Sequence, residues 1–501
     1  MTLVTDSLPN DLKALKALVA AQRAEIERLK MMIAKLRRTQ FGRSSEQLEA
    51  MINQLQLSLE ELEVSQTELT PPTTPPPRTV SRRKPLPEHL PREIHVHQPE
   101  SQCTGCGGQL RQLGEDVSEV LEYVPARFKV IRHVRPKWVC RCCEHIAQVP
   151  APSRPIARGL AGPGLLAHVL VSKFVDHLPL YRQSDIYARE GVDLERSTLA
   201  DWVGQSSQLL RPLINALERH VMSGHKLHAD DTPIGVLAPG NGKTKTARLW
   251  TYVRDDRTAG DSTPPAVWFA YSPDRKGLHP RAHLKDFSGV LQADGYAGFA
   301  QLYDSGTIQE AACWAHARRK FYDVYKDQSS PLAALTLQRI AALYAIESEI
   351  RGQPPNQRKF VRQNRASPLL EQLHTWLNQT LAQVSKKSTL GSAILYALNR
   401  WQALTRYCDD GRIEIDNNAA ERALRAVALG RKNYLFAGSD TGGDRAAAIY
   451  SLVGSSKLNG LNPQSYLTYV LERIAEYPIN RVDELLPWNV SLTPIEHCEA
   501  A

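Results

Sequence analysis

The chain has 501 residues with a formal net charge of +9, and 42% of its residues are hydrophobic. This length excludes one ordinary core, and this composition excludes general disorder. No apolar run reaches the roughly 18 to 20 residues of a membrane span. The first residues lack a signal pattern. We therefore expect a cytoplasmic protein of several domains with no membrane partner. Its basic balance favours a polyanionic partner such as nucleic acid.

Residues 1–70 carry a repeat typical of a coiled coil. Apolar residues recur at steps of three and four from Leu12 to Leu36 and again from Leu48 to Leu69. Such a seam packs against a partner helix. We expect self-association into a homo-oligomer through this segment. An intramolecular helical hairpin is the alternative.

Residues 71–95 are predicted to be a proline-rich basic linker. The run from Pro71 to Pro77 ends the preceding helix because proline lacks an amide proton. The basic cluster that follows, from Arg78 to Lys84, fits either a solvated linker or phosphate contacts.

Residues 96–148 contain a cysteine module. Two pairs with two-residue gaps, Cys103 with Cys106 and Cys140 with Cys143, supply four thiolates for a tetrahedral zinc ion. Cys142 is an alternative to either member of the second pair. Four thiolates leave no open position for chemistry, so the predicted zinc is structural. The isolated Cys313, Cys408 and Cys498 are interpreted as ordinary reduced residues.

Residues 149–222 are predicted to be helical. The stretch from Tyr187 to Val203 resembles a helix-turn-helix, with Gly191 at the turn and Ser197 capping the second helix. A helical hairpin that packs on its neighbours explains the same pattern.

Residues 223–330 show a run of short apolar strands, later alternating with helices. This order predicts a mixed sheet with flanking helices. Residues 331–410 interrupt it with helical periodicity. Residues 411–446 return to the sheet domain, and residues 447–501 form a helical region and a tail. The candidate strands are 226–230, 249–253, 266–271, 289–294 and 308–313.

Three carboxylates form the candidate catalytic site. Asp230 and Asp294 are each expected to close a strand, and Glu421 is expected on a helix. Acidic residues at strand ends do not fill a core. Clustered carboxylates repel one another, and divalent cations relieve that repulsion. Oxygen ligands suit magnesium or manganese, and two such ions can support phosphodiester chemistry. Asp231 is an alternative to Asp230, but alternation along a strand lets only one of them serve.

With these residues in place, the chain resembles the transposases typified by insertion sequence 66. The resemblance includes the string from Phe41 to Glu46 after the first apolar repeat, the cysteine module, and the string from Trp314 to Phe321. It also includes Asp416-Asn-Asn418 with Glu421, and it ends near Leu486-Pro-Trp-Asn489. The family often has Glu where this chain has Asp231.

The resemblance implies a multidomain α/β protein: an N-terminal leucine zipper, a zinc-binding module, a helical DNA-binding region and a ribonuclease-H-like catalytic domain with a helical insertion. It implies a DDE transposase that cleaves and transfers DNA strands with Asp230, Asp294 and Glu421 as the acid triad. Glu421 follows Asp294 by 127 residues, which fits the insertion. Accessory proteins encoded by the element are possible partners.

Basic residues near the acid triad are expected to contact DNA. In the resemblance they lie beside the catalytic centre, where Arg and Lys can hold phosphates. A solvated helix face is the alternative for both groups. The residues are His316, Arg318, Arg319, Lys320, Arg422, Arg425, Arg431 and Lys432. A DNA-binding regulator without catalysis, and a nuclease that cuts without joining, are the rival functions.

Overall fold

The computed structural model describes residues 159–492 except 238–243 and 435, together with residues 128, 130–131, 138–139, 146–147 and 153–157. The predicted coiled coil, the basic linker and the four zinc cysteines lie outside the described residues. Within the cysteine module, two short strands pair antiparallel: β1 (Trp138–Val139) and β2 (Ile146–Ala147). The described residues from 138 onward belong to one compact unit.

Between residues 163 and 222 the structure has four helices, in the region that the sequence predicted to be helical. They are α3 (Pro163–Phe174), α4 (Leu180–Arg189), α5 (Arg196–Leu209) and α6 (Arg211–Met222). Gly191 adopts a φ of +81° between α4 and α5, which accounts for a glycine at that turn. The predicted cap at Ser197 is wrong. Glu195 is the N-cap residue of α5, and the Ser197 hydroxyl donates a hydrogen bond to its carboxylate.

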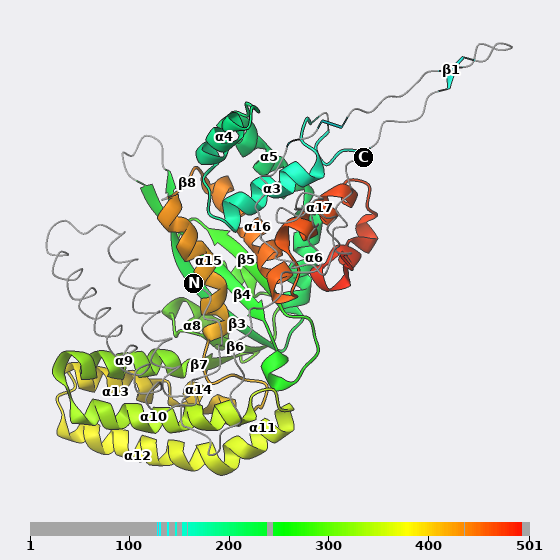
Figure 1. The fold of residues 1–501 in the computed structure, drawn as a ribbon. Coiled ribbons are helices and arrows are strands. Elements are labelled where there is room, and N and C mark those ends of the chain that lie inside the picture. Colours follow the sequence, from blue (N-terminus) through cyan, green and yellow to red (C-terminus); the bar gives the residue numbers. More distant parts are fainter. Residues whose placement is uncertain are drawn as a thin grey trace, which may run out of the picture. The chain divides into compact units, whose positions relative to one another are not determined.

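A mixed sheet follows these helices in the same compact unit (Figure 1). The strand order is β5-β4-β3-β6-β7, and the short β8 pairs with the far end of β3. β3, β4 and β5 are antiparallel, whereas β6 and β7 run parallel to β3. The strands are β3 (Lys226–Leu237), β4 (Thr244–Arg254), β5 (Ala266–Ser272), β6 (Gly289–Ala293), β7 (Ile308–Ala312) and β8 (Phe436–Ala437).

β3 differs from the prediction in its length. The sequence suggested that a strand ends at Asp230 before Thr232-Pro233, but β3 continues to Leu237. β3 tolerates Pro233, which has no amide proton, because no neighbouring strand pairs with β3 at this position on the side that faces β6. β6 pairs only as far as His228, and β8 begins pairing at Gly235. Asp230 therefore lies in the middle of a strand.

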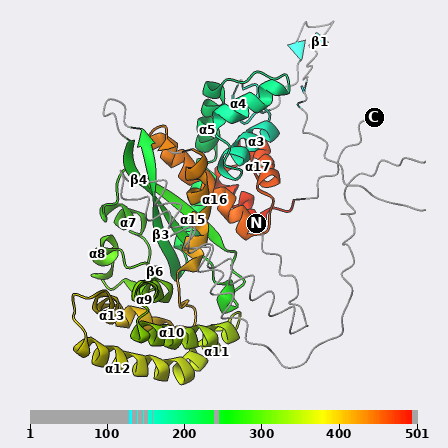
Figure 2. The same cartoon turned by 60° about the vertical axis from the view of Figure 1, so that its left-hand side comes forward.

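Helices cover both sides of this sheet, with α7 (Leu278–His283) and α8 (Ala300–Tyr303) on one side and α15 (Asn418–Asn433) and α16 (Asp440–Leu458) on the other (Figure 2). α16 also satisfies the edge strand β5: the amides of Val267 and Phe269 donate to the hydroxyls of Ser455 and Ser451. An edge strand left open would invite pairing with other chains. α16 runs across the boundary that we expected at residue 446, and α17 (Pro463–Arg473) packs on α3.

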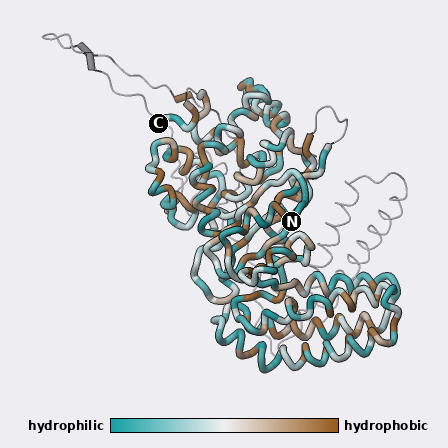
Figure 3. Tube along the Cα trace, turned by 180° about the vertical axis from the view of Figure 1, so that it is seen from behind, coloured by the Kyte–Doolittle hydropathy of each residue, from teal (hydrophilic) through white to brown (hydrophobic). Residues whose placement is uncertain are grey.

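The predicted insertion is a separate helical layer with its own apolar core. Its amphipathic helices show alternating hydrophobic and hydrophilic residues along the tube in Figure 3. Phe321 and Trp314 of α9 are fully buried in this second core, so α9 packs with the insertion although it precedes residue 331. The helices of this layer are α9 (Trp314–Gln328), α10 (Pro331–Ile350), α11 (Pro355–Val361), α12 (Ser367–Gln383), α13 (Thr389–Asn399) and α14 (Trp401–Thr405).

Candidate active site

Asp230 and Asp294 come from neighbouring parallel strands. His228 of β3 is in register with Gln292 of β6, and each aspartate lies two residues further along its own strand direction. The parallel pairing ends at this point, which leaves both aspartates beside the carboxyl end of β6. The Asp294 carboxylate accepts a hydrogen bond from the Tyr296 amide at 3.0 Å, and Gly295 turns the chain with a φ of +78°.

Glu421 is brought to this edge by Asn417, the N-cap residue of α15. The Asn417 side chain is fully buried. Its amide nitrogen donates to the Ala229 carbonyl at 2.9 Å, and its oxygen lies 3.0 Å from Nδ1 of His228. Because this oxygen can only accept, Nδ1 of His228 carries the proton. Burial, together with the nearby charge of Lys226, lowers the pKa of His228 to about 3, so the imidazole is neutral. Asn417 thus binds the start of α15 to the residues just before Asp230.

The helical insertion holds the backbone on both sides of the site. From α13 and the residue after it, Tyr396 and Arg400 donate to the carbonyls of Asp294 and Gly295 at 3.2 and 3.1 Å. Arg358 of α11 donates to the Glu414 carboxylate at 2.9 Å, two residues before Asp416. The insertion therefore fixes the Asp294 turn and the segment that leads into α15.

A buried ion-pair network holds Arg358 in position for its contact with Glu414. Glu347 of α10 accepts two hydrogen bonds from Arg362, at 2.7 and 2.6 Å, and lies 3.5 Å from Arg358. All three side chains are buried. Burial acts to raise the pKa of Glu414, but Lys226 and Arg358 outweigh it and lower that pKa to about 2. Glu414 is therefore an ionised anchor for Arg358.

The acidic side chains at this edge disfavour one another's ionisation. Burial raises the pKa of Asp230 well above its ordinary value, and the charges of Asp294 and Glu421 raise it further. Burial also raises the pKa of Asp416 to about 6, with contributions from Glu414 and Glu421. A bound divalent cation would reverse this penalty, and an all-oxygen donor set fits magnesium or manganese.

The oxygen atoms of the triad are not at ligand spacing. Among the described residues, the one group whose ligand atoms all lie within 4.8 Å of one another is Cys313, His316 and Glu421. Asp230 and Asp294 are outside this group. The structure thus places the three predicted acids within electrostatic reach but does not bring their oxygens to one point.

Asp231 has a different environment from Asp230. Its carboxylate lies 2.8 Å from Arg275 and 3.1 Å from Arg248, and its side chain is 1% exposed. Arg275 also stacks over the Tyr296 ring at 4.1 Å. The positive charges of Arg275 and Arg248 favour the ionised form of Asp231. The groups that act most strongly on Asp230 are acidic, and none of them is a cation.

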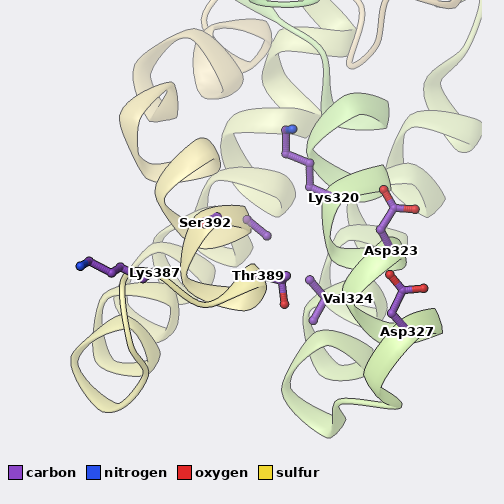
Figure 4. A pocket seen from close by; sticks show the side chains of 8 residues that line it. Lys320, Asp323, Val324, Asp327, Lys387, Thr389 and Ser392 are labelled. Carbon is purple, nitrogen blue, oxygen red and sulfur yellow. The ribbon is translucent and has the colours of Figure 1, made fainter. Parts of the chain in front are cut away.

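The basic residues on α9 that we expected near DNA have individual partners. His316 Nδ1 lies 3.7 Å from the Glu421 carboxylate, and Arg318 lies 6.0 Å from the Tyr322 ring. Lys320 lies 4.6 Å from the Tyr396 ring and lines a shallow pocket between α9 and α13 (Figure 4). Arg319 also has an interaction partner.

On α15 the basic residues divide into two kinds. Arg422, Arg425 and Lys432 are exposed. Arg431 is half-buried and donates to the Pro233 carbonyl of β3 at 2.5 Å. Arg431 thus ties the second half of α15 to the strand, complementing Asn417 at its start.

Sequence reasoning missed Asn417, His228 and Cys313 as parts of the site. The string Asp416-Asn-Asn418 belongs to the resemblance, but its spacing predicts no role for Asn417. Cys313 is a free cysteine, as predicted. Its sulfur also accepts a hydrogen bond from the backbone amide of Asn417 at 3.2 Å, which the sequence did not suggest. A cysteine three residues before a histidine, at a strand-to-helix junction, was the available signal.

Among the residues that the structure describes, none of the helices combines the length and the apolar character of a membrane span.

Four family models match the chain. The model described as "Transposase IS66 family" matches residues 158–445, which is more than half of the chain. A model of the zinc-finger binding domain of the same transposases matches residues 100–144. "Transposase C of IS166 homeodomain" matches residues 28–94, and "IS66 C-terminal element" matches residues 451–488.

Curated relatives match over nearly the whole chain. The uncharacterized protein y4hP of Sinorhizobium fredii is 43% identical over 487 residues, which covers 92% of this chain and 88% of the relative. The uncharacterized protein y4jD of the same organism is 39% identical, with 98% of both chains covered. A third, y4qI, is 38% identical over 98% of this chain and 99% of its own length.

Proposed function

The chain belongs to the transposase IS66 family, and from this premise we propose that it cleaves DNA strands at the ends of an insertion sequence and joins them to a target. The observation that supports the proposal is that Asp230 and Asp294 follow neighbouring parallel strands and that the charges of Asp294 and Glu421 act on Asp230. The hydrogen bonds of Asn417 to Ala229 and His228 hold the start of α15, and with it Glu421, beside β3. Family membership implies a role in transposition, and this cluster supplies the candidate chemistry.

The proposed catalytic fold is ribonuclease-H-like. Three antiparallel strands followed by two strands parallel to the first, in the order β5-β4-β3-β6-β7, support this assignment. The first acid on the central strand, the second after its parallel neighbour and the third on a later helix complete the pattern that the resemblance implies. The insertion of α10 to α14 falls between the second and third acids.

Asp230, Asp294 and Glu421 are the residues that would hold magnesium or manganese. When bound, such ions activate the attacking hydroxyl and stabilise the departing oxygen of a phosphodiester. The chain's own residues fix the donors: Asn417 orients α15, Tyr396 and Arg400 hold the Asp294 turn, and β3 holds Asp230. The triad oxygens are not at ligand spacing in this structure, so metal binding by all three requires Glu421 to approach Asp230 and Asp294.

DNA is the proposed partner of this edge. Exposed Arg422, Arg425 and Lys432 project from the same helix as Glu421 and can contact phosphates. We propose that His316, Arg318, Arg319 and Lys320 form a second basic border on α9. Binding that relies on these side chains should weaken steeply with salt, because each phosphate contact releases counterions.

The N-terminal segments complete the proposal. The zinc-finger match supports a zinc ion in the cysteine module, and we assign it to Cys103, Cys106, Cys140 and Cys143 in a structural role. Self-association through residues 1–70, accessory proteins encoded by the element and a place of action at the nucleoid are parts of the same proposal.

The test is strand cleavage and strand joining on DNA carrying the element's ends, with magnesium. We expect Asp294→Asn and Glu421→Gln each to bind DNA as the wild type does and to lose both reactions. Asp304→Asn is the matched control, because Asp304 is an exposed aspartate ten residues after Asp294. Joining at the normal rate by either triad variant would show that the assignment is wrong. Cleavage without joining of a pre-cut end would identify a nuclease, and binding without cleavage by the wild type would identify a regulator.

A further inference from the structure

A sulfur, a nitrogen and an oxygen donor meet beside the acid triad. Cys313 is the N-cap residue of α9, His316 is one turn into that helix, and Glu421 is in the first turn of α15. Their ligand atoms all lie within 4.8 Å of one another.

We propose that Cys313, His316 and Glu421 bind one thiophilic divalent cation of the zinc class. Thiolate and imidazole favour zinc, whereas carboxylate and water favour magnesium. Three protein ligands with an open fourth position are typical of zinc sites that exchange a ligand. The site is thus chemically distinct from the all-oxygen pair Asp230 and Asp294, although Glu421 can serve either.

The distances fit such an ion. Zinc-to-nitrogen and zinc-to-oxygen bonds of about 2.1 Å at a tetrahedral angle place the two donor atoms about 3.4 Å apart. Nδ1 of His316 lies 3.7 Å from Oε1 of Glu421. A shift of a few tenths of an ångström would bring this pair to ligand spacing.

An unsatisfied atom in this group fits a metal ligand. Nδ1 of His316 is buried and has no hydrogen-bond partner. A buried polar atom without a partner has lost its hydration at a cost in free energy, and a bound ion would offset that cost. His316 is 25% exposed and Glu421 is 22% exposed, whereas Cys313 is buried.

The surrounding backbone holds the donors in place before any ion binds. The Asn417 amide donates to the Cys313 sulfur at 3.2 Å, and the Trp314 amide donates to the Ile415 carbonyl at 3.1 Å. These bonds join the starts of α9 and α15. Hydrogen bonds that orient the ligands are typical of metal sites and strengthen binding.

Occupation of this site would hold Glu421 away from Asp230 and Asp294. This consequence rests on the proposed function, whereas the metal site itself does not. We therefore expect a zinc-class cation to inhibit magnesium-dependent cleavage through Cys313 and His316.

Cobalt is the probe for binding. The full-length protein, with its N-terminal cysteines saturated by zinc, is titrated with Co²⁺ while the thiolate-to-cobalt charge-transfer absorption is recorded. We expect one equivalent to produce this band in the wild type. Cys313→Ser should abolish it, and His316→Asn should weaken cobalt binding by at least about tenfold. His316→Asn keeps the test valid if the buried serine disturbs folding.

Cys408→Ser is the matched control, because Cys408 is the other buried free cysteine of the described chain and belongs to the insertion. It should keep the band. A wild type without the band, or a band that survives in Cys313→Ser, would overturn the proposed site. A second arm adds Zn²⁺ to the cleavage assay and compares each protein with its own zinc-free rate. Equal fractional inhibition of wild type and Cys313→Ser would overturn the competition for Glu421. Absence of wild-type cleavage with the cobalt band present would count against the proposed function alone.

Discussion

Replacing Asn417 by alanine should loosen the start of α15, which carries Glu421, from β3, which carries Asp230. The substitution removes a hydrogen bond to the Ala229 carbonyl and another to Nδ1 of His228. It leaves the buried His228 ring with an unpaired N–H. Each buried partner left unsatisfied costs about 1–3 kcal/mol. We therefore expect a loss of about 3 kcal/mol in the free energy of unfolding of this unit.

Thermal unfolding of the metal-free protein measures this loss. At about 2 °C per kcal/mol for a large domain, a loss of about 3 kcal/mol should lower the unfolding midpoint by roughly 6 °C. Arg412→Ala is the control, because Arg412 lies in the same segment but its side chain is 47% exposed and pairs with Asp410 at the surface. An exposed pair contributes about 0–1 kcal/mol, so the control should melt close to the wild type.

Asn417→Ala should also lose DNA cleavage at temperatures where it remains folded, because α15 no longer has a fixed start. Weaker cleavage with intact DNA binding would match this reasoning. A variant that melts and cleaves like the wild type would refute it, since the side chain would then not hold Glu421 in place.

The charges around the site lead to three more predictions. Glu347→Gln leaves the buried Arg362 without its carboxylate partner and should cost about 3–5 kcal/mol in urea unfolding. Glu349→Gln, on the exposed side of α10, should cost less than about 1 kcal/mol, and equal costs would contradict the network. Asp416 has its pKa raised from 3.8 to about 6, so its contribution to stability is present below about pH 4 and is lost as pH rises through 6. Between pH 4 and pH 6 the free energy of unfolding of the wild type should fall by up to about 3 kcal/mol because of Asp416, and Asp416→Asn should lack this decrease. The same dependence of unfolding on pH in both proteins would show that the pKa of Asp416 is not raised. Asp230→Asn should raise the unfolding midpoint in chelator and abolish the stabilisation by magnesium; a full magnesium response would contradict the role of Asp230.

Local patterns were sufficient to predict most of the elements. Strands at 249–253, 266–271, 289–294 and 308–313 were confirmed because short apolar runs between turns have few alternatives. The insertion was predicted from helical periodicity, and its helices are observed between residues 331 and 405. The predicted end of β3 was wrong because Thr232-Pro233 resembles a turn when read locally. The strands β6 and β8, which come much later in the chain, leave Pro233 without a hydrogen-bonded neighbour on one side of β3.

The site was predictable only in part for a similar reason. Asp294 follows the end of β6, as its position in the sequence suggested, whereas Asp230 was selected as a strand end but lies inside β3. Asn417 acts through contacts with residues nearly 190 positions earlier, and no local pattern encodes such a contact. Arg358 and Arg362 have the appearance of surface residues on a polar helix, yet both are buried because Glu347 faces them from α10. Cys313 gains its neighbours only when α9 and α15 start side by side.

Manganese soaked into crystals of the full-length protein would show whether the three acids bind a metal. Anomalous scattering locates the ion without relying on activity. We expect a manganese peak coordinated by Asp230, Asp294 and Glu421 in the wild type, and no peak there in Asp230→Asn. Manganese bound at other positions, with no density between these three carboxylates, would contradict this expectation.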